Sequence, residues 1–242
     1  MELRECKKHG KYEPQFMEVF GRQIECQCPK CAEEEEKADR EKMEEADRRR
    51  NYEKYISRGI EPEFFNVTLL DYIPENDTER KALDAAIQLR NGHCKKVLLL
   101  GSNGTGKTML ADALALELGG VRTTMYELSA KIRAGYSTGI NELDILDGLL
   151  KFPFIAIDEI GRTKGSEAEM NWLSYLIDKA HTRGIRLLLI SNKHQAQKLP
   201  RERQSEAIEF FLPNDAISRL RQNSIIVEVE GRDRRAATVA AV

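Results

Sequence analysis

The stretch Leu98–Leu114, "LLLGSNGTGKTMLADAL", decides the fold. An apolar run leads into Gly101, three glycines fall within six positions, and a helix-forming segment starts directly behind Lys107 and Thr108. Residues 101–108 fit the pattern G-x-x-x-x-G-K-[ST], in the required context of a strand before and a helix after. Glycines let the backbone turn so that its N–H groups point inward, and the helix N-terminus favours negative charge. The stretch therefore predicts a loop that binds phosphate.

This loop predicts roles for individual residues. Lys107 is expected to reach the β- and γ-phosphates of ATP, and the hydroxyl of Thr108 is expected to bind Mg²⁺. The other predicted nucleotide-binding residues are Gly101, Ser102, Asn103, Gly104, Thr105, Gly106 and Met109.

Two further motifs favour hydrolysis over binding alone. In "FIAIDEIG", Asp158 ends an apolar strand, where it can hold Mg²⁺ through water. Glu159, the next residue, is placed to act as general base on an attacking water. Asn192, at the end of "LLLISN", is expected to orient that water or contact the γ-phosphate. His194 follows closely, but we interpret it as a surface histidine and give it no role.

The region from about residue 64 alternates apolar strands with helices, which indicates an α/β fold with a parallel sheet covered on both faces. The expected strands are 95–102, 122–128, 152–158, 185–192 and 224–231. The expected helices are 109–118, 129–136, 141–150, 167–184, 205–212 and 215–223.

Four of the five cysteines fall within the first 31 residues. The pairs Cys6-x-x-His9 and Cys28-x-x-Cys31 have the spacing of a tetrahedral, structural Zn²⁺ site, although Cys26 could replace Cys28. Zinc would stabilise a segment too short to bury much apolar surface. We interpret Cys94, which stands alone, as a surface or semi-buried thiol.

The sequence divides into three predicted parts: a zinc-binding module (1–31), a charged helical linker (32–58) and an ATPase domain (59–242). In the linker, Glu recurs four residues before Lys or Arg, which supports an exposed helix. A solvated connecting helix is favoured there over a partner-binding one.

Charge and hydropathy exclude several classes of protein. The formal charge of −2 gives no overall attraction to nucleic acid, so any such surface must be local. No uncharged run approaches the ~18 apolar residues of a membrane helix, and the N-terminus lacks the apolar core of a secretory signal. We expect a cytoplasmic protein that has no membrane partner.

Together, "GSNGTGKTMLADALALEL", "IAIDEIG", "LLLISN" and "DAISRLRQNS" resemble the AAA+ ATPases, specifically the bacterial and phage replicative helicase loaders of the DnaC/IstB-like group. The segment 57–72, "SRGIEPEFFNVTLLDY", is similar to the stretch that leads into the ATPase core of that family. The resemblance implies a three-layer P-loop NTPase core. It also implies that Arg219 is an arginine finger acting on the neighbouring subunit's nucleotide, with Arg221 as the competing candidate.

The family also has a second sensor arginine, which we assign to Arg235, with Arg234 as the next candidate. Only about fifty residues follow Asn192, so a full helical lid is not expected. Family members bind single-stranded DNA with residues between the two nucleotide motifs. Here that window offers Lys131, Arg133 and Tyr136, although a solvated amphipathic helix explains these residues equally well.

The resemblance implies an ATP-dependent loader that binds the hexameric replicative helicase and deposits it on single-stranded DNA, with hydrolysis as the release switch. Self-association through the ATP site is expected, and residues 1–56 are the predicted helicase contact. The alternatives are an IstB-like ATPase that directs a transposase on DNA, and a nucleotide-binding adaptor without significant turnover.

Overall fold

Five strands pair as a parallel sheet in the order β6-β7-β8-β5-β9. Nearly all residues of the three central strands β7, β8 and β5 are buried, as expected for strands covered on both faces. The strands are β5 (Lys96–Gly101), β6 (Val121–Thr124), β7 (Phe154–Asp158), β8 (Arg186–Ile190) and β9 (Ser224–Val229). The predicted α/β fold with a parallel sheet is confirmed.

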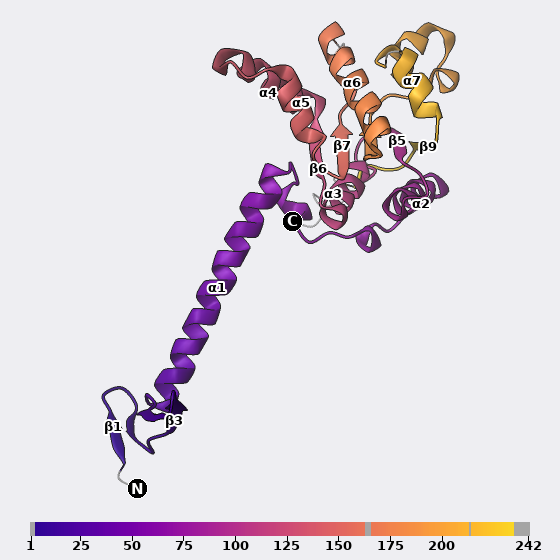
Figure 1. Cartoon of the computed structure of the whole chain (residues 1–242). Coiled ribbons are helices and arrows are strands. Elements are labelled where there is room, and N and C mark those ends of the chain that lie inside the picture. The colour runs from indigo at the N-terminus through magenta and orange to yellow at the C-terminus, as the bar shows by residue number, and fades with distance from the viewer. Residues whose placement is uncertain (1–2, 163–165, 213, 235–242) are drawn as a thin grey trace. The chain divides into compact units, whose positions relative to one another are not determined.

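This is a computed structural model, and it describes residues 3–162, 166–212 and 214–234. The chain divides into two units, residues 1–54 and 55–242, and the sheet belongs to the second. The helices of the second unit are α2 (Asp77–Asn91), α3 (Lys107–Leu118), α4 (Met125–Thr138), α5 (Glu142–Leu149), α6 (Glu167–Arg183) and α7 (Asn214–Arg221) (Figure 1).

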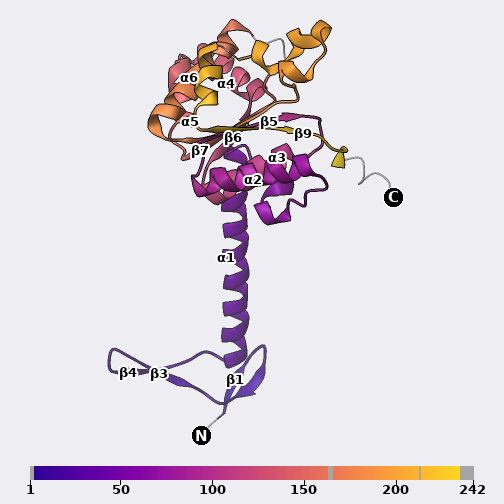
Figure 2. The same ribbon diagram turned by 90° about the vertical axis from the view of Figure 1, so that its right-hand side faces the viewer.

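The sheet is the middle of three layers, because alternate residues of each strand point to opposite faces. Leu98 and Leu100 of β5 join a core with α4, α5, α6 and α7, whereas Val97 and Leu99 join a second core with α2 and α3. Figure 2 shows α2 and α3 below the sheet and α4, α5 and α6 above it.

The strand expected at 122–128 ends earlier than predicted, because β6 stops at Thr124 and α4 begins at Met125. The side chain of Thr124 accepts a hydrogen bond from the backbone of Glu127, and the carboxylate of Glu127 accepts one from the backbone of Thr124. This capping box starts a helix inside a segment whose residue types favour a strand.

Residues 205–212 were expected to form one helix and instead contribute to two 3₁₀ helices. Ala207 is extended, with ψ of 154°, and this interrupts the helical backbone. The 3₁₀ helices of the second unit are Pro62–Phe64, Leu69–Asp71, Ala196–Lys198, Arg201–Glu206 and Ile208–Phe210. Cys94, expected at or near the surface, is buried with 4% of its surface exposed.

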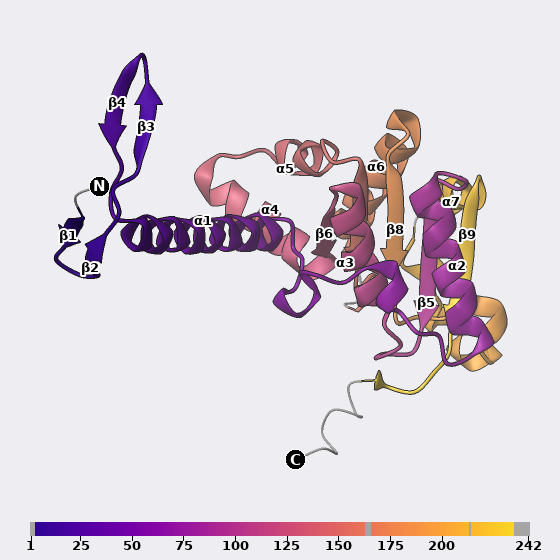
Figure 3. The ribbon, with the colours of Figure 1, turned by 90° about the horizontal axis from the view of Figure 1, so that it is seen from below.

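The first unit contains two antiparallel hairpins and most of a long helix. β1 (Arg4–Cys6) pairs with β2 (Gly10–Tyr12), and β3 (Phe16–Val19) pairs with β4 (Arg22–Glu25) (Figure 3). Helix α1 (Pro29–Ser57) buries none of its residues. It starts before residue 32, because Pro29 suits the first helical position, and so Cys31 lies in its first turn.

Within the described residues, none of the helices combines the length and apolar character needed to cross a membrane.

Candidate nucleotide and zinc sites

The loop between β5 and α3 has a backbone that only glycine allows. Gly101, Gly104 and Gly106 all have positive φ, between 74° and 104°. A Cβ on Gly104 would lie 1.9 Å from an oxygen of Asp233, and one on Gly106 would lie 2.6 Å from the ring of Tyr72. Glycine is therefore required here both by conformation and by space.

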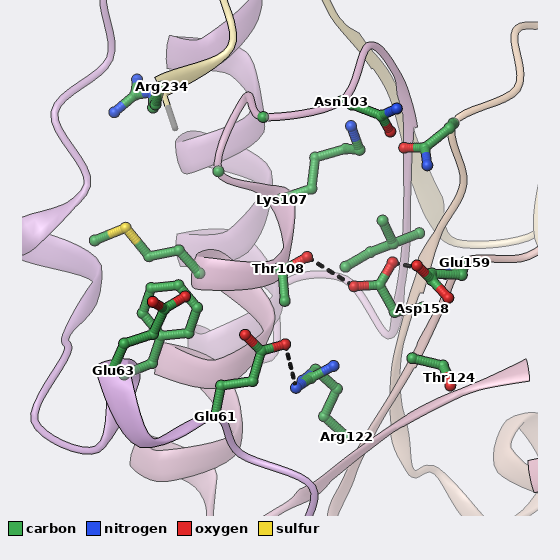
Figure 4. A pocket seen from close by; sticks show the side chains of 16 residues that line it. Glu61, Glu63, Asn103, Lys107, Thr108, Arg122, Thr124, Asp158, Glu159 and Arg234 are labelled. Atoms are coloured by element: carbon green, nitrogen blue, oxygen red, sulfur yellow. Dashed lines mark hydrogen bonds and ion pairs between the residues drawn. The ribbon is translucent and has the colours of Figure 1, made fainter. Parts of the chain in front are cut away.

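A cavity of about 310 Å³ opens beside this loop. It brings together most of the residues that the three motifs predicted (Figure 4). These are Asn103, Gly104, Gly106, Lys107, Thr108, Met109, Asp158, Glu159 and Asn192. Parallel strands of one sheet end at the same edge, which explains why residues so far apart in sequence meet here.

Lys107 is buried among the carbonyls of its own loop. Its ammonium donates hydrogen bonds to the carbonyl oxygens of Gly101 (2.9 Å) and Ser102 (2.5 Å), and it lies 3.3 Å from the hydroxyl of Thr105. These three residues do not line the cavity, but they hold the lysine at its wall.

Asp158 and Thr108 form the part of the pocket that is suited to a cation. The hydroxyl of Thr108 donates a 2.8 Å hydrogen bond to the carboxylate of Asp158. Burial raises the pKa of Asp158, and the hydrogen bond from Thr108 opposes this shift. A buried carboxylate beside a hydroxyl is an oxygen donor set that fits Mg²⁺.

Glu159 adopts a left-handed backbone conformation, with φ of 58°. Its amide donates a 2.6 Å hydrogen bond to the side chain of Asp158, and its carboxylate forms an ion pair with Arg162. The carboxylate therefore lies beside the cation-binding part of the cavity, within the wall that Asn192 also lines.

Part of the wall comes from residues that the sequence analysis did not assign. Glu61, Glu63 and Phe64 line the cavity from the segment before the sheet, and Arg122 and Thr124 line it from β6. The likeness of segment 57–72 to the family was the available signal, but it carried no residue roles.

Arg122 lies in a nearly buried charge cluster. Its guanidinium donates to Asp112 (2.6 Å) and to Glu61 (2.9 Å). Burial raises the pKa of Asp112 to about 6, although the charge of Arg122 opposes the shift.

The predicted arginines lie in different places. Arg234 lines the cavity, whereas Arg235, the first choice for the second sensor, lies outside the described residues. Arg219 does not line the cavity and pairs with Asp178 of α6 at 2.7 Å. The side chain of its competitor, Arg221, is also outside the described part.

The predicted DNA-contacting residues Lys131, Arg133 and Tyr136 are all exposed on α4. The hydroxyl of Tyr136 donates a 2.7 Å hydrogen bond to Glu142 of α5. His194 is half-buried and faces Glu228 of β9 at 3.5 Å.

In the first unit, Cys6, His9, Cys28 and Cys31 gather their ligand atoms within 4.8 Å of one another. The Sγ atoms of Cys6 and Cys31 are 3.5 Å apart, and Nδ1 of His9 is 3.3 Å from Cys31 and 3.8 Å from Cys28. Ligand atoms of a tetrahedral site with bonds of about 2.0–2.3 Å lie roughly 3.3–3.8 Å apart, so the cluster fits Zn²⁺. Cys26 is not part of it.

The remaining nitrogen of His9 supports the same interpretation. Its Nε2 lies 3.1 Å from the carboxylate of Glu34, which fixes Nδ1 as the atom that faces the thiols. A carboxylate on the outer nitrogen is common for zinc-binding histidines.

Residues 97–210, which contain the loop, the acid pair and Asn192, match the ATPase family associated with various cellular activities (AAA). No curated protein matches the chain in sequence.

Solved structures with this AAA fold include three proteins of DNA replication. The chain is similar to a DNA replication initiation factor (TM-score 0.58, 19% identity, 74% of this chain and 53% of that one). It is similar to the DnaC helicase loader, with a TM-score of 0.57 and 21% identity, over 70% of this chain and 100% of that one. The third is the replication initiator DnaA bound to AMPPCP and single-stranded DNA, with a TM-score of 0.57 and 19% identity, over 72% of this chain and 51% of that one.

The chain spans about half the length of the first and third of these proteins. The likeness at these identities is one of fold. The predicted resemblance to DnaC/IstB-like AAA+ ATPases is confirmed at the level of the fold, because the AAA family match and the likeness to the DnaC structure agree with it.

Proposed function

We propose that this chain is a cytoplasmic, Mg²⁺-dependent ATPase that loads the hexameric replicative helicase onto single-stranded DNA. The observation that carries the proposal is the pocket, which places a phosphate loop, an acid pair and a polar strand end around one cavity in an AAA domain. The fold likeness to a DnaC helicase loader supports a helicase as the protein that this ATPase acts on. The likeness covers the whole solved chain of that loader.

In the proposed reaction, Lys107 turns its ammonium from the loop carbonyls to the phosphates of ATP. Mg²⁺ bound through Thr108 and Asp158 would neutralise charge on the phosphates. Asn192 orients the attacking water, and Glu159 takes a proton from it. The water oxygen bonds to the γ-phosphorus as the bond from that phosphorus to the bridging oxygen breaks, which gives ADP and inorganic phosphate. Hydrolysis then releases the helicase from this protein.

The zinc module is the proposed helicase contact. Its hairpin β3–β4 exposes Phe16, Met17, Phe20 and Ile24, a set of apolar side chains that a monomer gains nothing by exposing. Lys131, Arg133 and Tyr136 are the proposed contacts to single-stranded DNA, because cations beside an aromatic ring suit sequence-tolerant binding.

Size-exclusion chromatography with purified replicative helicase tests the client. The full chain should co-elute with the helicase in ATP, and hydrolysis should weaken the complex. Glu159→Gln should lower turnover at least about a hundredfold and trap the complex. Normal turnover by Glu159→Gln would show that the base is another residue, and co-elution with a transposase but not with the helicase would move the chain to the transposition alternative.

A further inference from the structure

Two short turns carry the proposed base and the amide that orients the water. Residues 159–161 follow β7, and residues 191–193 follow β8, its neighbour in the sheet. Together the two turns line a second cavity, of about 170 Å³. Glu159 and Asn192 line this cavity and the nucleotide cavity as well, so the two cavities adjoin at these residues. The separation of the turns therefore sets the separation of the two groups that act on the water.

A buried hydroxyl joins the two turns. Ser191 is completely buried, and its Oγ donates a 2.5 Å hydrogen bond to the carbonyl oxygen of Ile160. The same Oγ accepts a 3.1 Å hydrogen bond from the amide of Lys193. Ile160 directly follows Glu159. Asn192 lies between Ser191 and Lys193. One hydroxyl is therefore hydrogen-bonded beside each of the two functional residues.

Backbone hydrogen bonds attach the turn after β8 to β5 and the phosphate loop. The amide of Ser191 donates to the carbonyl of Leu99 at 3.0 Å. The carbonyl of Lys193 accepts a hydrogen bond from the amide of Gly101 at 3.1 Å, and Gly101 is the first residue of the loop. The turn that carries Asn192 is thus fixed relative to the loop, and the Ser191 hydroxyl extends this attachment to the turn that carries the base.

Close packing and one backbone hydrogen bond also hold the turn after β7. Gly161 has a φ of 76°, and a Cβ there would lie 3.1 Å from the ring of Phe211 and 3.3 Å from the side chain of Lys193. The amide of Ile160 donates to the carbonyl of Ile190 at 3.0 Å. Because these contacts do not depend on a hydroxyl, we expect the turns to stay in place without it. The hydroxyl would then determine only their fine separation.

We propose that Ser191 is a positioning residue, whose hydroxyl holds Glu159 and Asn192 at the separation that the attacking water requires. The inference rests on the proposed ATP site. Ser191 does not line the nucleotide cavity, so it acts through its neighbours and not on ATP. A displacement of about 1 Å can slow a reaction roughly a hundredfold when it separates the reacting groups. Loss of the hydroxyl therefore slows the chemical step and leaves ATP binding unchanged.

Two substitutions at Ser191 test the proposal in the full-length chain, with helicase and single-stranded DNA present. Ser191→Ala should lower turnover at saturating ATP about tenfold, and its affinity for a non-hydrolysable ATP analogue, measured by calorimetry, should stay within about twofold of wild type. Ser191→Cys fills the same space, but a thiol is a weak hydrogen-bond donor, so this variant should also be slow. It replaces Ser191→Ala if that variant does not fold, as judged by circular dichroism.

Ser129 of α4 provides the matched control, because it is also buried and its hydroxyl donates a 2.8 Å hydrogen bond to Glu169. Ser129→Ala removes the same atom outside the nucleotide cavity, so it should turn over ATP like wild type. A double-mutant cycle adds a second readout. Since Ser191 acts partly through Asn192, Ser191→Ala should slow the Asn192→Ala chain by clearly less than tenfold.

Three results would each overturn the proposal: wild-type turnover by Ser191→Cys, fully multiplicative effects in the cycle, or a loss of ATP affinity that accounts for the slower rate of Ser191→Ala. Slow turnover by Ser129→Ala would also overturn it, because any lost buried hydroxyl would then have the same effect. A wild-type chain that neither binds nor hydrolyses ATP would instead refute the ATP site on which the inference rests.

Discussion

Glu159 is the one non-glycine residue of the pocket wall with a left-handed backbone. Such a conformation costs free energy for most residues and persists where surrounding contacts enforce it. Here the amide hydrogen bond to Asp158 enforces it. The backbone turn places two adjacent acids in different environments, one buried against Thr108 and one at the mouth of the cavity.

The ion pair with Arg162 holds the carboxylate of Glu159, the proposed base, so this carboxylate has to leave Arg162 before it can contact the attacking water. We expect Arg162→Ala to raise ATP turnover, by up to about fivefold for an exposed pair. Phosphate release at saturating ATP measures this. Arg203→Ala, which breaks an i,i+3 pair with Glu206 away from the pocket, is the control. A fall in turnover for Arg162→Ala would show that Arg162 assists the reaction.

Asp112 predicts a specific pH dependence. Its folded pKa of about 6 exceeds its ordinary value, so between pH 4 and 6 the folded chain binds more protons than the unfolded chain. The stability that Asp112 contributes is therefore full below pH 4 and lost as the pH rises to 6, by at most about 3 kcal/mol.

Relative to Asp112→Asn, the wild type should lose unfolding free energy between pH 4 and 6 and keep a constant difference above pH 7. Urea denaturation at a series of pH values measures this. Asp144→Asn, a change at an exposed position of α5, should not alter the slope. A difference in unfolding free energy that stays constant across this range would mean that the charge of Arg122 cancels the effect of burial on the pKa of Asp112.

At the scale of elements, zinc bound by the Cys₃His cluster would join parts that are too small to be stable separately. Cys6 ends β1, His9 precedes β2, and Cys28 and Cys31 flank the start of α1. Two short hairpins and a helix that buries no residue have little apolar surface to hold them together.

Cys28→Ser should therefore release zinc and unfold residues 3–28, whereas Cys26→Ser should keep one zinc per chain. Metal content by mass spectrometry and tryptic digestion of the module measure the two effects. The AAA domain should melt at the same temperature in both variants, because the cluster lies in the other unit. Loss of zinc from Cys26→Ser alone would reverse the assignment of the fourth ligand.

Some helices and strands could be predicted from the sequence, and others could not. Buried strands such as β5 and β7 were predictable, because continuous aliphatic runs ending in glycine or acid permit few other interpretations. The start of α4 was not, because a capping box decided it against the preference of its residue types. The cavity wall formed by Glu61, Glu63 and Phe64 required tertiary contacts, since no motif links these residues to the loop.

At the scale of the whole molecule, Arg219 cannot serve its own nucleotide pocket. The ammonium of Lys96, at the first residue of β5, donates a 2.6 Å hydrogen bond to the carbonyl of Arg219, whereas the phosphate loop follows the last residue of that strand. Five residue steps along a strand separate the two ends by about 17 Å. An arginine finger at this position therefore has to act on the ATP of a neighbouring chain.

A finger supplied by the neighbour predicts complementation between two inactive variants. Lys107→Ala should not bind ATP, and Arg219→Ala should bind ATP but not hydrolyse it. Mixed in equal amounts, they should recover about a quarter of wild-type turnover, because one interface in four pairs an intact pocket with an intact finger. Arg183→Ala, which breaks another exposed ion pair of α6, should be active alone. A mixture as inactive as its components would exclude Arg219 as a finger acting between chains.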